Sequence, residues 1–380
     1  MKKVLKTVGF VLMALILVVG IYFAYVMIDY HRIDDNQEIE VLGTALSDAP
    51  VPTGQEMEIS SWNIGFAAYT ADFGFFMDGG TESRAFSEDA VVDNMNSIIE
   101  KIDGFGSDFI FVQEVDTEST RSYEVNELDM LTEGLSYSTS EMYTTDADGN
   151  KVSQDITIPV MNSTFGVNYD SPYLCYPFKE PFGKAKSGIL TMSRYHIDSS
   201  LRRSLPIQTN LAKLVDLDRC YTVNRLKCDN GRELVLFNFH LSAYTTDPTI
   251  VNQQIEMLNA DMLAEYEKGN YVIAGGDFNK DILGDSSLFF GVSGEDYSWA
   301  QSYPFDLIPD GFSLIAPYDE LNPVPSCRNA DGPWDPEKQF QITIDGFITS
   351  ANVLDGECRV VDTQFENSDH NPIQMHFVLK

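Results

Sequence analysis

Short apolar segments with the length of β-strands recur along most of this chain, and they restrict its fold more than any other feature. Several alternate apolar and polar residues with a period of two, as Leu234–Leu241 does, which is typical of strands. Helical patterns lie between them, over Ser87–Ile102 and over Pro248–Glu267, where Asp247 is the expected N-cap. Strands and helices mixed in this way predict a layered α/β sandwich. The other predicted strands are Met57–Ile64, Phe109–Gln113, Gly188–Met192, Leu211–Leu217, Val272–Gly275, Ile342–Thr349 and Gln374–Leu379.

Residues 1–28 predict a Lys-rich start followed by a transmembrane anchor. Lys2, Lys3 and Lys6 precede Val8–Ile28, a run of 21 residues without charge. As a helix this run would be about 31 Å long, enough to cross the hydrocarbon core of a bilayer. Positive charge before the run and acidic residues after it predict a single-pass protein of the cell membrane, with a cytoplasmic N-terminus and an extracytoplasmic remainder. A cleaved signal peptide is the alternative.

The rest of the chain is predicted to be a linker over residues 29–54 and one domain over residues 55–380. The linker is polar, with acidic residues, glycine and two prolines, which is typical of a tether. The sequence after it contains no repeat, no low-complexity tract and no second linker. Within the domain, Tyr137–Ser163 is expected to be a hairpin insertion that turns at Asp148-Gly149-Asn150. Asp281–Gln339 is expected to be a long irregular loop, and loops of that size are often functional.

The charge balance argues against a protein whose main role is to bind nucleic acid. The chain has 25 basic and 58 acidic side chains, a net charge of −33. Tight binding to a polyanion draws on a surplus of Lys and Arg, so nucleic acid is a disfavoured partner without being excluded. The five cysteines match no metal-binding spacing. Cys327 and Cys358 could pair in an exported domain, and free thiols are the alternative.

Polar side chains stand at the ends of the predicted strands. A single polar residue after a strand is usually a cap or a turn residue. Six strand ends that all carry Asn, Glu, Asp or His are harder to explain in this way, because a sheet gathers its strand ends along one edge. We therefore expect these side chains to share one cleft. They are Asn63, Glu114, His240, Asp277 with Asn279, Asp345, and Asp369 with His370 just before the last strand.

The order and the residues of these segments resemble the sequence motifs of the endonuclease/exonuclease/phosphatase superfamily, which has the deoxyribonuclease I-like fold. The resemblance implies a four-layer α/β sandwich of two packed β-sheets flanked by helices. It also implies hydrolysis of a phosphoester with the help of a divalent cation, usually Mg²⁺, with Mn²⁺ or Ca²⁺ as alternatives. The matching stretches are Trp62-Asn63-Ile64, Gln113-Glu114-Val115, Phe239-His240-Leu241, Gly276-Asp277-Phe278-Asn279, Ile344-Asp345-Gly346 and Ser368-Asp369-His370, and they span residues 62–370.

The resemblance also implies a role for each matching residue. Glu114 corresponds to the principal metal ligand, and Asn63 and Asp369 would complete or steady the metal site. A hard cation such as Mg²⁺ takes few protein oxygens and leaves room for water and phosphate, which suits this set. His370 resembles the general base that takes a proton from the attacking water. Asp345 would hold the other ring nitrogen of this histidine and fix its tautomer.

Three further residues are expected to handle the phosphate. By the resemblance, Asp277 and Asn279 would position the water and bind the phosphate, and His240 would stabilise phosphoryl charge or assist the leaving group. One feature departs from the nuclease branch, where a carboxylate on a central strand pairs with the residue matching His240. The corresponding segment here, Gly183–Met192, offers Lys and Ser residues but no carboxylate.

The substrate class stays open at this level. Lys186, Arg121 and Arg328 are candidate phosphate contacts, weighed against ordinary surface charges. A monomeric phosphodiesterase or phosphatase acting on phospholipid head groups or small phosphate esters is the preferred interpretation. An extracellular endonuclease or exonuclease acting on DNA or RNA is the first alternative. A catalytically inactive surface binding module is the second, and it is disfavoured because every matching position holds a residue that can function.

Overall fold

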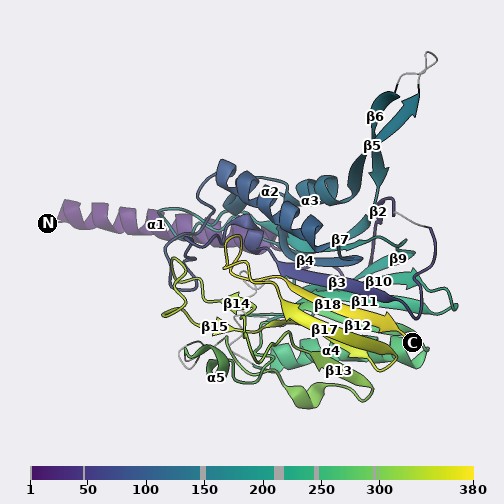
Figure 1. Ribbon diagram of the computed structural model, residues 1–380. Coiled ribbons are helices and arrows are strands. Elements are labelled where there is room, and N and C mark those ends of the chain that lie inside the picture. The colour runs from purple at the N-terminus through teal and green to yellow at the C-terminus, as the bar shows by residue number, and fades with distance from the viewer. Residues whose placement is uncertain are drawn as a thin grey trace.

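The structure is a computed structural model that describes residues 2–45, 48–145, 151–208, 218–243, 248–292, 294, 297 and 299–380. Within these residues, two seven-stranded sheets pack face to face (Figure 1). The first sheet contains, in spatial order, β17 (Val353–Val360), β18 (Ile373–Leu379), β3 (Glu56–Asn63), β4 (Phe109–Asp116), β8 (Lys186–Ser193), β7 (Asn162–Asp170) and β2 (Leu42–Gly43).

The second sheet carries three further predicted strands, as β11, β12 and β16. Two small two-stranded ribbons lie outside the main sheets, β5 (Tyr137–Thr145) with β6 (Lys151–Pro159) and β14 (Cys327–Arg328) with β15 (Gln341–Ile342). The spatial order of the second sheet is β1 (Gln37–Ile39), β9 (Ser199–Ser204), β10 (Cys220–Lys227), β11 (Glu233–His240), β12 (Tyr271–Asp277), β16 (Asp345–Ser350) and β13 (Phe312–Ile315).

Alternation along the strands decides which side chains fill each layer. On β11, Leu234 and Leu236 point between the two sheets, where Phe111 and Phe347 join them. The intervening residues of β11, such as Phe237, point the other way into the layer between sheet and helix. The period of two read from the sequence therefore builds two separate apolar layers from one strand.

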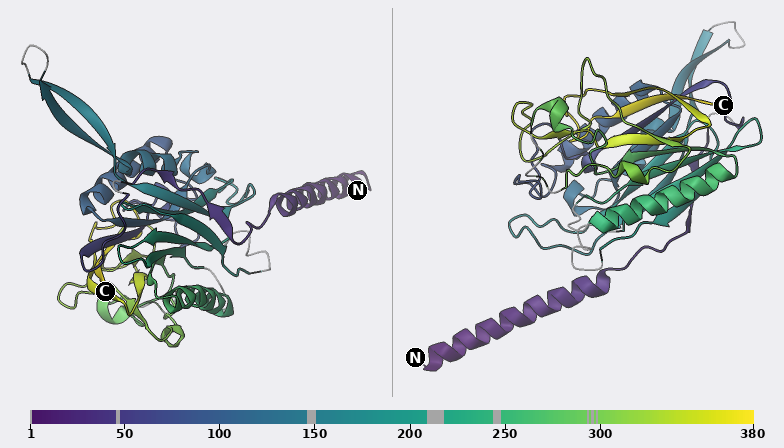
Figure 2. Two further views of the ribbon diagram at one scale, coloured as in Figure 1. Left: turned by 90° about the vertical axis from the view of Figure 1, so that its right-hand side faces the viewer. Right: turned by 90° about the horizontal axis from the view of Figure 1, so that it is seen from below.

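Helices cover the outer face of each sheet. α2 and α3 pack on the first sheet, and α4 packs on the second (Figures 1 and 2). The predicted four-layer α/β sandwich is confirmed. The helices are α2 (Glu88–Phe105), α3 (Glu127–Leu135), α4 (Pro248–Glu267) and the short α5 (Ser287–Phe290), with 3₁₀ turns η1 (Gly65–Ala67), η2 (Thr120–Ser122) and η4 (Phe305–Leu307).

The N-terminal helix α1 (Lys2–Asp29) projects from the domain (Figure 2). Among the described residues it is the one helix long and apolar enough to cross a membrane, and nearly all of its apolar side chains are exposed. The segment 29–54 differs from the expected free tether. Its β1 pairs with β9 and its β2 pairs with β7, so it adds an edge strand to each sheet. Backbone pairing of this kind leaves little trace in a polar sequence.

Other expectations have mixed outcomes. The hairpin insertion is confirmed as β5 and β6, although its turn at residues 148–150 lies outside the described residues, as do the predicted strand 211–217 and the N-cap at residue 247. The long segment 281–339 is less irregular than expected, because β13 within it pairs with β16 at the sheet edge. All five cysteines are free thiols, so Cys327 and Cys358 form no disulfide.

Candidate active site

Parallel pairing of neighbouring strands brings four of the predicted residues to one end of the two sheets. They are Asn63, Glu114, His240 and Asp277. β3 and β4 run parallel, and Asn63 pairs with the residue before Glu114. In the facing sheet, β11 and β12 run parallel, and His240 lies opposite Asp277. Because the carboxyl ends of parallel strands meet at one edge, each sheet delivers two polar side chains to the same cleft.

The remaining residues arrive on antiparallel strands. Asp345 was predicted to end a strand, but it begins β16, which runs antiparallel to β12 and places Asp345 opposite Asp277. His370 precedes β18, whose first residue, Ile373, pairs with Ser61 near the end of β3. The beginning of an antiparallel strand lies beside the end of its neighbour, so both residues still reach the cleft.

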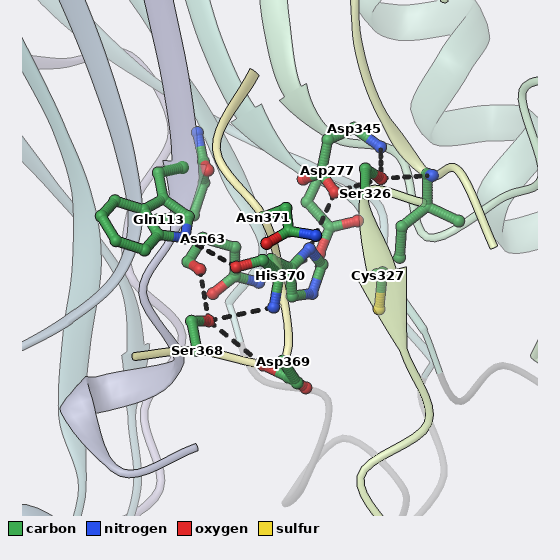
Figure 3. Close-up of polar contacts among 12 residues, drawn as sticks. Asn63, Gln113, Asp277, Ser326, Cys327, Asp345, Ser368, Asp369, His370 and Asn371 are labelled. Carbon is green, nitrogen blue, oxygen red and sulfur yellow. Dashed lines mark hydrogen bonds and ion pairs between the residues drawn. The ribbon is translucent and has the colours of Figure 1, made fainter. Parts of the chain in front are cut away.

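A buried histidine–aspartate pair occupies the centre of the site (Figure 3). The Nδ1 atom of His370 donates to Oδ2 of Asp345 over 2.8 Å. The hydroxyl of Ser326 donates to the same carboxylate oxygen over 2.7 Å, and it accepts the backbone N–H of Asp345. The indole of Trp62 donates to the backbone oxygen of His370 over 2.8 Å. These contacts hold the imidazole in one orientation, with its Nε2 atom away from Asp345.

The electrostatics of this pair favour a charged imidazole. Burial alone would lower the pKa of His370, but the adjacent Asp345 carboxylate outweighs burial and raises that pKa well above its ordinary value. The pair therefore stabilises a proton on His370 once one has been transferred. Sequence reasoning did not find Ser326, which supports the pair, because a lone serine in a loop shows no pattern.

Asp277 lies across the cleft from His370. Its Oδ2 atom is 3.7 Å from Nε2 of His370 and 3.4 Å from Nε2 of His240, and it accepts from Nδ2 of Asn63 over 3.1 Å. Its Oδ1 atom accepts the backbone N–H of Asn279 over 2.7 Å. Burial, together with the nearby Asp345 carboxylate, raises the pKa of Asp277 to about 7. Asn279 has a positive φ of 49°, and its side-chain amide donates to a backbone oxygen at residue 241.

A second group of oxygen ligands lines the same cleft. The side-chain amide of Asn63 donates to Oε1 of Glu114 over 3.3 Å. Glu114 sits where the pairing of β4 with β8 is interrupted, and its φ of 56° turns its half-buried side chain out of the strand register. Such strain costs on the order of 1 kcal/mol or more and tends to occur at functional sites. Asp369 lines this cleft as well, and burial raises its pKa to about 6, with the neighbouring Glu114 adding to the effect.

These carboxylates fit a divalent cation. Glu114, Asp277 and Asp369 all line a narrow cleft of about 70 Å³. Beyond burial, the charge of Glu114 raises the pKa of Asp369, and the charge of Asp345 raises the pKa of Asp277. A hard cation would neutralise this charge through the oxygen ligands it prefers.

The cleft contains two sets of side chains that could hold a cation. The first set is Asp277, Asp345 and His370, which offer two carboxylate oxygens and one ring nitrogen within 4.8 Å of one another. The hydrogen bond between Asp345 and His370 already explains that proximity. The second set offers the carboxylates of Glu114 and Asp369, whereas the amide nitrogen of Asn63 donates to Glu114 and its Oδ1 atom accepts the backbone N–H of Gly65 over 3.0 Å.

His240 lies at the back of the cleft without a carboxylate at its second ring nitrogen. Its Nδ1 atom is buried and has no hydrogen-bond partner among the described residues, and the same holds for the hydroxyl of Ser187. Burial lowers the pKa of His240 well below its ordinary value, so the ring is neutral. This agrees with the absence of a carboxylate from the segment 183–192 in the sequence.

The candidate phosphate contacts separate into three cases. Arg328 lines the cleft, although its guanidinium donates to backbone oxygens of Thr70 and Gly332 over 3.0 and 3.3 Å. Arg121 is buried, and its guanidinium donates to both carboxylate oxygens of Asp116 over 2.9 and 2.8 Å. These donors therefore stabilise the fold instead of facing a phosphate. Lys186 is not among the residues that line the cleft, and its nearest ion pair is with a surface glutamate. Arg219 does line the cleft. Sequence reasoning missed it because it belongs to none of the motifs and comes just before β10.

Taken together, two packed sheets with a histidine–aspartate pair and clustered oxygen ligands at one edge define a class of phosphoester-cleaving proteins. The chain belongs to the Endonuclease/Exonuclease/phosphatase family, whose model matches residues 60–370. Members of this family are hydrolases that act on phosphoesters and typically use divalent metals. A search among curated proteins finds no match to the sequence.

Several solved structures are similar to this chain at low sequence identity. An endonuclease/exonuclease/phosphatase from Beutenbergia cavernae is 14% identical with a TM-score of 0.50, over 86% of this chain and 72% of that one. A family protein from Bacteroides vulgatus is 14% identical with a TM-score of 0.47, over 86% and 100%. The human Nocturnin catalytic domain is 17% identical with a TM-score of 0.47, over 90% and 98%.

Proposed function

We propose that this protein is a divalent-metal-dependent phosphoester hydrolase in which water attacks phosphorus directly. The observation that carries the proposal is the buried pair of His370 and Asp345, whose second ring nitrogen, Nε2, lies 3.7 Å from Asp277 across the cleft. A general base must present a free nitrogen within reach of a water and must be held by a partner on its other side. Asp345 is that partner, and a cation bound in the cleft would oppose the positive charge on His370 and favour the neutral ring, whose Nε2 can accept a proton.

The residues of the chain divide the work of the reaction. His370 accepts a proton from the attacking water at Nε2, and Asp345 stabilises the imidazolium that results. Asp277 accepts a hydrogen bond from that water and, with Asn279, orients it towards phosphorus. His240 is neutral and can donate from Nε2 to a phosphoryl oxygen.

The metal would be held by Glu114, Asn63 and Asp369. A cation there would neutralise charge on the phosphate and polarise the P–O bond. Mg²⁺ is the preferred ion because Glu114 and Asp369 would supply hard carboxylate oxygens, with Mn²⁺ and Ca²⁺ as alternatives.

The preferred substrates are phospholipid head groups or small phosphate esters, handled by a monomer whose domain lies on the extracytoplasmic side of the membrane. The net charge of −33 disfavours DNA or RNA, so a nuclease is the second candidate. A surface module without activity is the third, and the complete set of functional side chains in one cleft argues against it.

The test uses the full chain purified in detergent, assayed with Mg²⁺ against phosphodiesters, phosphomonoesters and plasmid DNA. We expect turnover that EDTA abolishes and Mg²⁺ restores. His370→Ala should reduce turnover to background, whereas His376→Ala should not, because His376 is a half-buried histidine of β18 that pairs with Glu58 away from the cleft. Turnover that persists in EDTA, or that survives in the His370 variant, would remove the proposed mechanism.

A further inference from the structure

A second cavity opens directly beside the catalytic cleft. It encloses about 540 Å³, compared with about 70 Å³ for the cleft itself. Both are lined by Tyr69, Glu114, Arg219 and His240, so the two spaces adjoin at these residues. His370 and Asp277 line the cleft but not the larger cavity. The cavity therefore meets the cleft at residues other than the proposed general base.

The walls of this cavity are mainly apolar and aromatic. The few polar side chains on them include Arg121, whose guanidinium is already bound by Asp116 and lies 3.8 Å from the ring of Phe66. Such a surface suits an apolar group and not a polyanion. The apolar wall consists of Phe75, Phe76, Met77, Leu174, Tyr176 and Phe182.

The apolar helix α1 forms part of the same wall. Tyr22 of α1 lines the cavity, and its hydroxyl donates to the backbone oxygen of Tyr173 and accepts the backbone N–H of Cys175. Two residues of the adjoining loop are strongly exposed, Tyr176 at 62% and Phe178 at 82%. Exposed aromatic side chains beside the end of a spanning helix are typical of the membrane interface. The cavity wall thus includes residues from α1 and from the loop that α1 contacts.

We propose that this cavity binds the apolar chains of a lipid phosphoester taken from the membrane, with its phosphate in the catalytic cleft. The proposal rests on the proposed hydrolase function and names its substrate class. It commits to one occupant because the cavity is mainly apolar, shares lining residues with the catalytic cleft, and is bordered by the one candidate membrane span among the described residues.

The arrangement also assigns the bond that breaks. Water attacks phosphorus from the side of His370, and the leaving oxygen lies on the opposite side, towards the apolar cavity. The bond from phosphorus to the lipid oxygen breaks as the bond from phosphorus to the water oxygen forms. The proton taken by His370 is balanced by a proton that the departing lipid alkoxide gains. The products are a lipid alcohol in the cavity and a water-soluble phosphate.

The test compares substrates that are identical at phosphorus and differ only in their apolar part. The full chain is reconstituted in vesicles of a phosphorus-free glycolipid and given dioleoyl phosphatidic acid or glycerol 3-phosphate, then dioleoyl phosphatidylcholine or glycerophosphocholine. Bis(p-nitrophenyl) phosphate and a DNA oligonucleotide complete the panel. We expect kcat/KM for the better lipid to exceed that of its soluble counterpart at least 100-fold, with diacylglycerol as the lipid product.

A variant pair separates the cavity from the chemistry. Met77→Glu places a charge in the apolar wall at a position that is 36% exposed, and Met77→Leu keeps the wall apolar. The first should lower the ratio of lipid turnover to bis(p-nitrophenyl) phosphate turnover at least tenfold, and the second should preserve it. The ratio is independent of the folded fraction of each variant. Leu321→Glu, at an exposed position that lines neither space, should leave the ratio unchanged.

The outcomes distinguish the two proposals. Turnover of bis(p-nitrophenyl) phosphate or DNA without preference for any lipid would overturn the lipid proposal and leave the hydrolase intact. An equal ratio for Met77→Glu and Met77→Leu would also overturn it. Preference for the oligonucleotide would assign the aromatic wall to stacked bases instead. If the parent protein hydrolyses none of these substrates, the hydrolase function itself is overturned, and the lipid proposal with it.

Discussion

Replacing Asp345 by asparagine tests the assignment of general base and metal ligands in one experiment. The carboxylate accepts from Nδ1 of His370 over 2.8 Å and from the hydroxyl of Ser326 over 2.7 Å. Asparagine has nearly the same shape and can still accept both hydrogen bonds through its carbonyl oxygen. The substitution therefore removes the negative charge and little else.

The size of the effect follows from the charge separation. When His370 holds the proton from water, its positive charge lies about 4 Å from the carboxylate charge, which is worth about 4 kcal/mol at an effective dielectric constant of about 20. A loss of about 4 kcal/mol in the transition state corresponds to a rate lower by about three powers of ten. We therefore expect Asp345→Asn to lower kcat about 1,000-fold.

The assay measures kcat against Mg²⁺ concentration for the parent protein, Asp345→Asn and Glu114→Gln. If Asp345 positions the base, its variant loses rate but reaches half of its maximum at the parental Mg²⁺ concentration. Glu114→Gln should instead need far more Mg²⁺, because it loses a ligand. A parental kcat in Asp345→Asn would refute the charge argument. A large rise in the Mg²⁺ requirement of that variant would move the metal to the set of Asp277, Asp345 and His370.

Two further predictions concern the stability of the domain. Arg121→Leu should lower the free energy of unfolding by about 3–5 kcal/mol in urea titrations, because it leaves the buried Asp116 carboxylate without its two hydrogen bonds; an unchanged midpoint would contradict this. Burial opposes ionisation of Glu265, but its contact with Arg225 outweighs burial and lowers the pKa of Glu265 from 4.5 to about 2. The stabilisation that the Glu265 carboxylate gives is therefore present above about pH 4.5 and is lost as pH falls towards 2. Because solvent screens this partly exposed pair, we expect Glu265→Gln to lower the free energy of unfolding by about 1–2 kcal/mol at pH 6 and by much less near pH 3. An equal loss at both pH values would show that the carboxylate charge is not responsible.

The strand pattern and the residues of the cleft could be predicted from the sequence. Periodicities of two and 3.6 are local properties, so β3, β11, α2 and α4 were found nearly at their true limits. Polar side chains at strand ends stand out in an apolar run, which identified Asn63, Glu114, His240 and Asp277 without a structure. Long irregular segments were harder, because β1, β2 and β13 are held by backbone pairing to distant strands.

Only the tertiary structure decided how those residues contact one another. The contact of His370 with Asp345 was expected from the family resemblance, and the structure shows it. The contact of Arg121 with Asp116 in place of a phosphate was not expected, because it depends on buried side-chain packing. The apolar cavity depends on it even more, because its wall combines Tyr22 of α1 with residues near 75, 175 and 219. The sequence by itself determined which elements form and which side chains can do chemistry, since both follow from neighbours along the chain. The cavity and the pairing of charges needed the fold, because they arise between residues that are far apart in the sequence and meet only when the two sheets and α1 pack.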